Sequence, residues 1–279
     1  MPDYETIEVE RDGRVAIVRF SRPNVLNAMN GQFFREWVQA TDELNADSSV
    51  GAIVVTGAGR AFSSGADVSD FRRASEGDEQ VKSDWAKYQP IAFSGKRLTD
   101  SKPLVGAING LALGAGLTCT FWFDVNIAST TARFSMRFAA LGLTPELDST
   151  WLLPRIVGLQ RAKEMMLTER IYDAEEACDL GIVRRIVEPE ALETEAIALA
   201  TEIAAHPVST LSTIKRMVFD DLLTTDFATI DKRSEQNFSD ARRSPEHREA
   251  LRALAQKRDP QYHDVAHMAE IVARMSGRS

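Results

Sequence analysis

The sequence predicts an α/β fold that ends in a helical region, and two observations carry this prediction. Strand-like and helix-like segments alternate as far as residue 187, and every later segment has a helical pattern. Such alternation is typical of a sheet whose strands are connected by helices. The length of 279 residues fits one domain with a smaller appendage. We therefore expect an α/β core over residues 1–205 and a helical region over residues 206–279.

The first hundred residues begin with a predicted hairpin, because Asp12-Gly13 separates two β-rich runs within residues 7–20. Apolar residues then recur at helical spacing over residues 31–47, and a short apolar run at 51–56 indicates a buried strand. Residues 69–100 are polar and charged. They form either a mobile helical segment near a site or a solvated insert.

The middle of the chain alternates between short strands and helices. Asp173 and Glu176 have the spacing of a capping box, and Gly181 is the expected stop of that short helix. The strands are expected at 103–108, 125–129, 133–138 and 182–187, and the helices at 114–123, 159–169 and 173–181.

Composition excludes several classes of function. The net charge of −8 and the pI of about 5.2 argue against a general nucleic-acid binder. Residues 103–123 carry no charge, but Asn109, two threonines and the lack of a second such span favour buried strand and helix over a membrane segment. The N-terminus shows no signal peptide, and two cysteines suit a reducing compartment. We expect a cytoplasmic protein.

Two glycine turns are candidates for chemistry. Gly65 precedes Ala66, and Gly114 and Gly116 flank Ala115, each at the expected start of a helix. Backbone N–H groups in a first helical turn have no intrahelical partner. Two such groups could converge on one oxygen and form an oxyanion hole. The alternative is two ordinary turns after buried strands.

Metal and nucleophilic sites are poorly supported. His263 and His267 are four residues apart, with Glu270 beyond, but no third ligand is indicated and surface histidines are the simpler interpretation. No G-x-S-x-G motif is present, and neither cysteine has a histidine nearby in the sequence. We expect no metal.

Six segments together carry a family resemblance. They are RPNVLNAMN (22–30), IVVTGAGRAFSSGADV (53–68), KPLVGAINGLALGAGL (102–117), FDVNIAS (123–129), LPRIVGLQRAKEMMLTERIYDAEEACDLGIVRRIV (153–187) and the closing REALRALAQKRDP. In this order and spacing the chain resembles the crotonase family, the enoyl-CoA hydratase/isomerase superfamily, over nearly its whole length.

The resemblance implies a spiral of repeated ββα units, with a C-terminal helical region that trimerises and closes the CoA site. A homotrimer or a hexamer (a dimer of trimers) is expected. The ligand is an acyl-CoA thioester, with no separate cofactor because CoA is part of the substrate. The oxyanion-hole donors correspond to the N–H groups of Ala66 and Ala115. The implied substrate- and CoA-binding residues are Leu26, Asn27, Ala28, Ser64, Gly65, Asp67, Gly114, Phe138 and Lys257.

The chain departs from the family where a hydratase carries its two glutamates. Those positions correspond to Thr118 and Phe138. A hydroxyl group is a poor general base at neutral pH and a phenyl ring has no proton to exchange. Water addition by the usual route is therefore not expected.

Glu146 corresponds to a position where other branches of the family carry an acid. Isomerases place an aspartate there as a proton shuttle, and a dehalogenating branch places an aspartate there as a nucleophile. Asp148 is a second candidate, as a partner that tunes Glu146. From the residues alone, Asp148 could instead N-cap the following helix, and Glu146 could be a solvated loop acid.

The sequence thus predicts an acyl-CoA enzyme that stabilises a thioester enolate, most simply an enoyl-CoA isomerase with Glu146 as proton shuttle. One alternative is an enoyl-CoA hydratase with a different acid/base set that uses Glu146 or Asp148. The other is an acyl-CoA-binding protein without catalysis.

Overall fold

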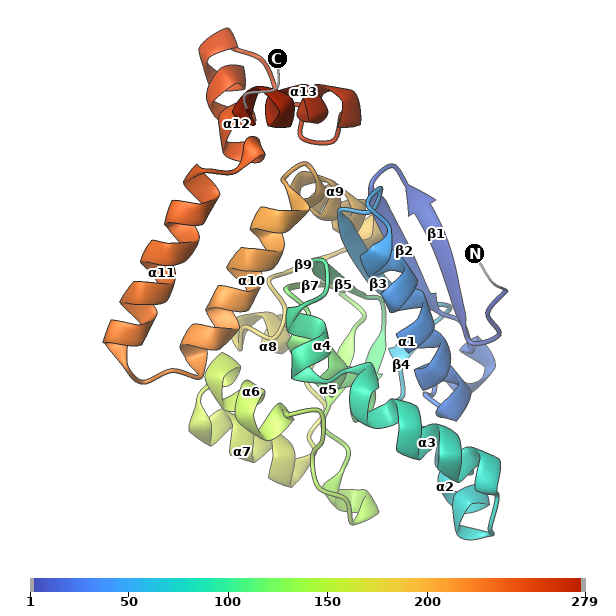
Figure 1. The fold of residues 1–279 in the computed structure, drawn as a ribbon. Helices are drawn as coiled ribbons and strands as arrows, with labels where there is room; N and C mark the ends of the chain where they lie inside the picture. The colour runs from blue at the N-terminus through green and yellow to red at the C-terminus, as the bar shows by residue number, and fades with distance from the viewer. Residues whose placement is uncertain (1–2, 277–279) are drawn as a thin grey trace. The chain divides into compact units, whose positions relative to one another are not determined.

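The computed structural model describes residues 3–276, which divide into two compact units between Ile203 and Ala204. The first unit contains every strand of the described chain, and the second contains helices only. The α/β class predicted from the alternation of segments is therefore confirmed (Figure 1).

A six-stranded sheet forms the centre of the first unit, in the order β1-β2-β3-β5-β7-β9. The first pair is the predicted antiparallel hairpin, and all other neighbours are parallel. Every residue of β3 and β5 is buried, as expected of parallel strands covered on both faces. The strands are β1 (Ile7–Asp12), β2 (Val15–Phe20), β3 (Ala52–Gly57), β5 (Leu104–Ile108), β7 (Val125–Ser129) and β9 (Arg185–Val187).

A second, three-stranded parallel sheet has the order β4-β6-β8. Its strands are β4 (Ala61–Ser63), β6 (Leu111–Leu113) and β8 (Arg133–Ser135), each of which follows a strand of the large sheet. This is the expected repeat of paired strands. The sequence did not predict β4 and β6, and it predicted a β8 that continues to residue 138. The reason is that three residues are too few to show the two-residue period of a strand.

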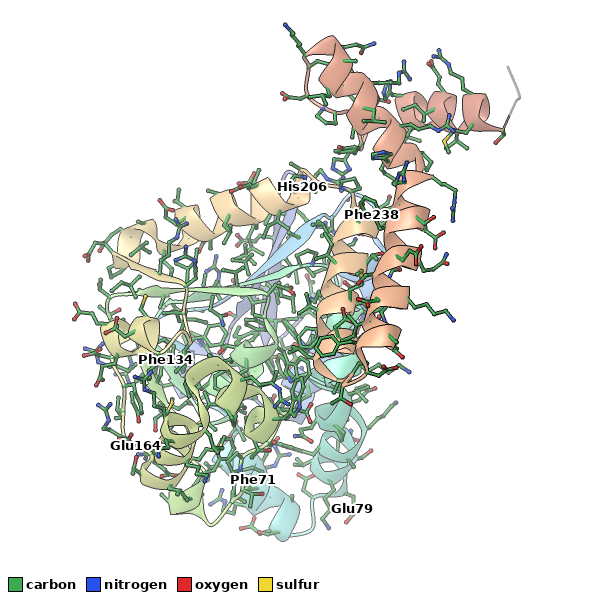
Figure 2. The ribbon with its side chains drawn as sticks, turned by 90° about the vertical axis from the view of Figure 1, so that its left-hand side faces the viewer. Phe71, Glu79, Phe134, Glu164, His206 and Phe238 are labelled. Atoms are coloured by element: carbon green, nitrogen blue, oxygen red, sulfur yellow. The ribbon has the colours of Figure 1, made fainter. Side chains whose placement is uncertain are left out.

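An aromatic cluster joins α1 (Gly31–Ala46) to the sheets. The ring of Phe20 in β2 lies 4.8 Å from that of Phe33 and 5.8 Å from that of Trp37, both in α1. It also lies 5.0 Å from the ring of Phe62 in β4. These side chains are fully buried, as is Phe134 of β8 (Figure 2). Their burial fixes α1 against the sheets, because large aromatic side chains dominate the energetics of a core.

Residues 69–100 are helical, as expected in the first of the two alternatives for this segment. They form α2 (Val68–Ser75), α3 (Glu79–Ala92) and α4 (Gly95–Thr99). The side chain of Trp37 donates to the carbonyl of Ala92 at 2.8 Å, and Arg35 pairs with Asp84 at 3.3 Å. These contacts join α3 to α1.

The remaining helices of the first unit follow the prediction with one correction. The segment expected as one helix over 114–123 is a single turn of α-helix, α5 (Ala115–Thr118), continued by a 3-10 helix (Cys119–Trp122). The capping box of Asp173 and Glu176 is present. The other helices are α6 (Ser149–Val157), α7 (Leu159–Thr168), α8 (Ala174–Asp179) and α9 (Leu192–Ala204), with 3-10 turns at Pro23–Val25, Ala139–Leu141 and Pro189–Ala191.

The second unit consists of α10 (Val208–Leu222), α11 (Phe227–Arg242), α12 (Pro245–Gln256) and α13 (Val265–Met275). Buried Glu249 joins its last two helices, because it accepts from Arg258 at 2.6 Å, from His267 at 2.7 Å and from the Gln261 N–H at 2.9 Å. The Arg258 hydrogen bond is the main reason that the pKa of Glu249 falls to about 2. The expected role of these helices in trimerisation stays a prediction.

The uncharged stretch 103–123 is folded into β5, β6 and short helices. Within residues 3–276, no helix has the length and apolarity required to cross a membrane.

Candidate active site

Two glycine turns meet at one end of the small sheet. One follows β4 and contains Gly65, and the other follows β6 and contains Gly114, each with positive φ (92° and 52°). A Cβ atom on Gly65 would lie 2.6 Å from the carbonyl oxygen of Leu113 and 3.2 Å from the nitrogen of Ala115. Only glycine permits this close approach. The two turns predicted as separate candidates are therefore adjacent.

The turns leave two N–H groups without partners. Met29 bonds to both neighbours of Ala66: its N–H donates to the carbonyl of Gly65 at 2.8 Å, and its carbonyl accepts from Asp67 at 2.9 Å. In such a parallel bridge the N–H of Ala66 points away from Met29. Ala115 begins α5, where no intrahelical acceptor exists. Neither N–H donates a hydrogen bond within the described chain.

A cavity of about 490 Å³ opens beside these two groups. Segments far apart in the sequence line it: the two turns, α2, α3 and the stretch after β8. The lining residues are Ser64, Gly65, Ala66, Val68, Phe71, Trp85, Gln89, Leu113, Gly114, Ala115, Arg137, Phe138, Ala140, Leu141, Leu143, Thr144 and Glu146.

Glu146 is the one carboxylate among these lining residues. It is half-buried, and the side-chain amide of Gln89 donates to its Oε2 at 2.8 Å. Burial raises the pKa of Glu146, and the Gln89 donor offsets this only in part. The backbone that follows is held by Trp122, whose indole N–H donates to the carbonyl of Leu147 at 3.0 Å. A carboxyl group can both take and return a proton, and a raised pKa makes it a stronger base.

Asp148 does not reach the cavity. It is exposed, with a left-handed backbone (φ 57°), and it occupies the position before α6. Its side chain makes no capping hydrogen bond; only its carbonyl accepts, from Trp151 and Leu152 at 2.9 Å. The pairing of Asp148 with Glu146 in catalysis therefore has no geometrical support, and the alternative side-chain cap is absent too.

The two positions that depart from the family pattern are both buried. Phe138 is 5% exposed and lines the cavity. The hydroxyl of Thr118 is fully buried and has no hydrogen-bond partner in the described structure. Neither side chain supplies an acid to the cavity.

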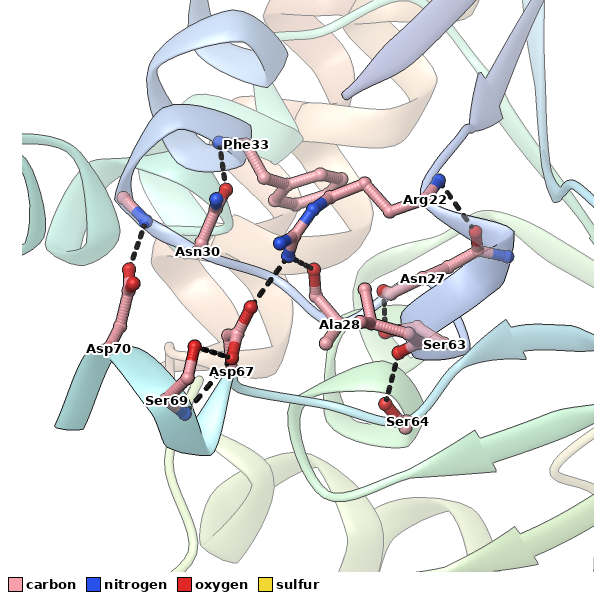
Figure 3. A network of polar contacts seen from close by, with 12 residues as sticks. Arg22, Asn27, Ala28, Asn30, Phe33, Ser63, Ser64, Asp67, Ser69 and Asp70 are labelled. Atoms are coloured by element: carbon pink, nitrogen blue, oxygen red, sulfur yellow. Dashed lines mark hydrogen bonds and ion pairs between the residues drawn. The ribbon is translucent and has the colours of Figure 1, made fainter. Parts of the chain in front are cut away.

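The segment 22–28 contacts the turn that contains Gly65, because the N–H of Ser64 donates to the carbonyl of Leu26 at 2.9 Å. Buried Asn27 uses its side-chain amide to donate to the carbonyls of Ala58 and Ala61, and its oxygen accepts from Arg22 (Figure 3). The side-chain polar groups of Asn27 are thus used within the protein. Neither Leu26, Asn27 nor Ala28 lines the cavity.

Asp67 has a structural role. Its carboxylate caps α2 by accepting from the N–H and the hydroxyl of Ser69 at 3.0 and 2.6 Å, and it pairs with Arg22 at 2.8 Å (Figure 3). Burial alone would raise the pKa of Asp67, but these hydrogen bonds and the positive charge keep it below its usual range. Oδ1 of Asp67 accepts from Ser69 and Oδ2 pairs with Arg22. Both carboxylate oxygens therefore bond within the protein, which leaves no unoccupied oxygen atom for the predicted contact with substrate.

Lys257 belongs to the second unit, where it ends α12 in a left-handed conformation and is exposed. Its contact with a CoA phosphate stays a prediction. Within residues 3–276, no group of three histidine, cysteine, aspartate or glutamate side chains is arranged to hold a metal ion.

The sequence allowed a helical segment near a site over residues 69–100, but no residue of α2 or α3 was predicted as part of the site. Phe71, Trp85 and Gln89 line the cavity from the segment that the sequence left open as either helical or a solvated insert. Trp85 and Gln89 are four residues apart and so share one face of α3, which is the signal that could have found them.

The comparisons with known proteins identify the family and the fold. A family model described as enoyl-CoA hydratase/isomerase matches residues 10–265. A probable enoyl-CoA hydratase of Mycobacterium tuberculosis is 34% identical over 93% of this chain and 98% of its own. A 1,2-epoxyphenylacetyl-CoA isomerase of Escherichia coli is 32% identical, over 89% and 94% of the two chains. A crystal structure of enoyl-CoA hydratase from Bacillus anthracis superposes with a TM-score of 0.84 and 27% identity, over 92% and 99% of the two chains.

Proposed function

This chain belongs to the enoyl-CoA hydratase/isomerase family, and from that premise we propose that it shifts the double bond of an enoyl-CoA thioester with Glu146 as the proton carrier. Members of the family named among its relatives are enzymes that act on CoA thioesters, and a hydratase and an isomerase both occur. The observation that carries the choice of isomerase is the single carboxylate in the cavity.

The reaction begins with the thioester oxygen against the N–H groups of Ala66 and Ala115. Glu146 takes a proton from C2 of a 3-enoyl-CoA, the C2–H electron pair forms a C1–C2 double bond, and the C1–O π pair moves onto the thioester oxygen. With the C3–C4 double bond this gives a dienolate. The two N–H donors stabilise the negative charge on the thioester oxygen, and losing one such donor costs on the order of 3–4 kcal/mol. Glu146 then returns the proton to C4, which gives the 2-enoyl-CoA. On protonation at C4, the C1–O double bond re-forms, the C1–C2 pair becomes the C2–C3 double bond and the C3–C4 pair binds the proton.

The raised pKa of Glu146 supports this role. A carboxyl group whose pKa lies closer to neutrality is a stronger base toward C2 and remains a competent acid toward C4. Proton transfer alone needs no cofactor, so CoA enters only as part of the substrate. Hydration instead requires groups that hold and activate water, and Thr118 and Phe138 supply no carboxylate for that purpose.

Assembly and location are further parts of the proposal. We expect a homotrimer or a dimer of trimers, as the family resemblance implies. A cytoplasmic location is supported by Cys119 and Cys178, which are both free thiols.

The test compares wild type with Glu146→Gln on a 3-enoyl-CoA. The variant keeps the size of the side chain and its contact with Gln89 but cannot carry the proton, so kcat should fall about 10²–10⁴-fold. Asp148→Asn, two residues away and exposed, is the matched control and should keep wild-type activity. Isomerisation at an unchanged rate by Glu146→Gln would refute the proposal.

Two other outcomes separate the alternatives. Rapid water addition to a 2-enoyl-CoA, without isomerisation of a 3-enoyl-CoA, would identify a hydratase with a different acid/base set. Tight binding of CoA thioesters with no turnover of either substrate would identify a binding protein.

A further inference from the structure

Two aromatic side chains form a continuous wall of the cavity, and we call Phe71 and Trp85 the aromatic wall. Their ring centroids lie 5.1 Å apart with an interplanar angle of 38°. Both rings line the cavity. Phe71 comes from α2 and Trp85 from α3, so the wall exists only when these two helices are packed together.

The wall is held rigidly from behind. The Trp85 ring contacts Phe34 of α1 edge-on, with centroids 5.0 Å apart. Its indole N–H donates to Asp70 at 3.0 Å, and buried Asp70 also accepts from the N–H of Gly31 at the start of α1. The only polar atom of the indole ring is therefore satisfied by Asp70, and the ring offers an apolar surface in a set orientation.

The aromatic wall lies on the acyl side of the cavity. Trp85 is one helical turn before Gln89, whose amide holds Glu146, and Glu146 faces the acyl carbons in the proposed reaction. The stretch that carries Glu146 adds further apolar side chains: Phe138, which is buried, and Leu141 and Leu143, which are 58% and 45% exposed. Large apolar side chains exposed around a concavity are typical of a ligand-binding site.

We propose that this cavity selects acyl groups that carry an aryl ring, and that the aromatic wall makes the selection. The inference rests on the proposed function, because it uses Glu146 to identify the acyl side. A cavity of about 490 Å³ lies in the range used for drug-sized ligands, far more than a four-carbon acyl group occupies.

A ring suits the wall better than a chain of equal carbon number. A flexible chain loses rotational freedom when it is held against a rigid surface, whereas a ring has lost that freedom before binding. A ring can also stack offset or edge-on against Phe71 and Trp85, a geometry that aromatic pairs favour. Burial of apolar area alone predicts the opposite order, since a linear chain exposes more surface to bury.

The test measures dissociation constants of two unreactive thioesters by calorimetry. Phenylacetyl-CoA and octanoyl-CoA both carry eight acyl carbons, and neither has a carbon–carbon double bond to shift along an acyl chain. Wild type should bind phenylacetyl-CoA about ten-fold more tightly. Phe71→Leu and Trp85→Leu should each bring the two constants to within about two-fold of each other.

The controls separate the wall from the fold. Tyr88→Leu changes an aromatic residue of the same helix that does not line the cavity, and it should keep the wild-type preference. Phe71 is 39% exposed, so Phe71→Leu folds even where Trp85→Leu does not, and circular dichroism reports folding of both. The inference is overturned if wild type binds octanoyl-CoA as tightly as phenylacetyl-CoA, or if the preference survives Phe71→Leu.

The experiments distinguish an error in the proposed aryl selectivity from an error in the proposed isomerase reaction. Binding of these two thioesters does not require proton transfer, so Glu146→Gln should retain the preference for phenylacetyl-CoA. An enzyme that isomerises a 3-enoyl-CoA through Glu146 but prefers octanoyl-CoA overturns the aryl selectivity alone. A protein that prefers phenylacetyl-CoA but has no isomerase activity overturns the proposed reaction alone.

Discussion

The two sides of the cavity are built from different parts of the chain. On the donor side, the turns around Gly65 and Gly114 present the backbone N–H groups of Ala66 and Ala115, and the fit depends on the absence of a Cβ atom. On the acid side, the proposed proton carrier is the side chain of Glu146, held by Gln89 from a helix 57 residues earlier. Backbone donors tolerate changes of side chain, whereas a side-chain acid is lost with one substitution. In the proposed mechanism, the reaction can therefore change on the acid side while enolate stabilisation persists.

The largest effect on the donor side is expected from Gly65→Ala. The added methyl group would lie 2.6 Å from the carbonyl oxygen of Leu113, so the two turns must separate and the two N–H groups no longer converge. Loss of one donor lowers kcat about 10²–10³-fold in comparable sites. Steady-state kinetics on a 3-enoyl-CoA should show a loss of that size.

Gly77→Ala is the matched control for this substitution. Gly77 also has a positive φ of 99°, but a Cβ atom there would meet nothing within 4 Å. It should lose about 1 kcal/mol of stability through backbone strain and keep full activity. Equal losses of activity in both variants would show that strain, and not the separation of the turns, is responsible.

A smaller effect is expected on the acid side from Gln89→Leu. Removing the donor to Oε2 withdraws a contact that favours the ionised carboxylate, so the pKa of Glu146 should rise further. The acid limb of the pH profile of kcat/KM should then shift to higher pH, with kcat reduced about ten-fold by the loss of orientation.

Gln80→Leu controls for the loss of a glutamine amide from the same helix. Gln80 also donates to a carboxylate one turn away, Asp84, at 3.1 Å, but it is exposed and outside the cavity. Its pH profile should match that of wild type. An unshifted acid limb in Gln89→Leu would mean that Gln89 does not set the proton affinity of Glu146.

The smallest effect is expected from Asp67→Ala, beside the donor side. Loss of a helix cap typically lowers stability by about 1 kcal/mol, and no N–H donor is moved. The pKa of Asp67 is lowered in the folded protein, so its stabilisation is present above the ordinary aspartate pKa of about 3.9 and is lost as pH falls below it. Thermal unfolding across pH 2–7 should show a weaker acid-side decline in the variant, at unchanged KM.

The prediction from sequence succeeded where one short segment determines the geometry. The turns at Gly65 and Gly114 are local, so their adjacent positions after two strands could be anticipated. Asp67 and Asn27 were predicted to touch the ligand, but their side chains bond within the protein. Spacing alone cannot tell a buried polar residue that contacts a ligand from one that contacts a carbonyl 31 residues away. Asp148, also predicted as a site residue, is not among the residues that line the cavity, and two left-handed residues, Leu147 and Asp148, turn the chain at that point.

Sequence by itself determined the α/β class and the family, and it predicted the two donor turns and the acid, because each depends on local patterns or on motifs in a given order. Only the tertiary structure decided what surrounds Glu146. The packing of α3 on α1 brings Gln89 to the carboxylate of Glu146 and places Trp85 beside Phe71. Such contacts join residues with no periodic relation along the chain. Their physical cause is the shared burial of helix faces, which appears only once the chain has folded.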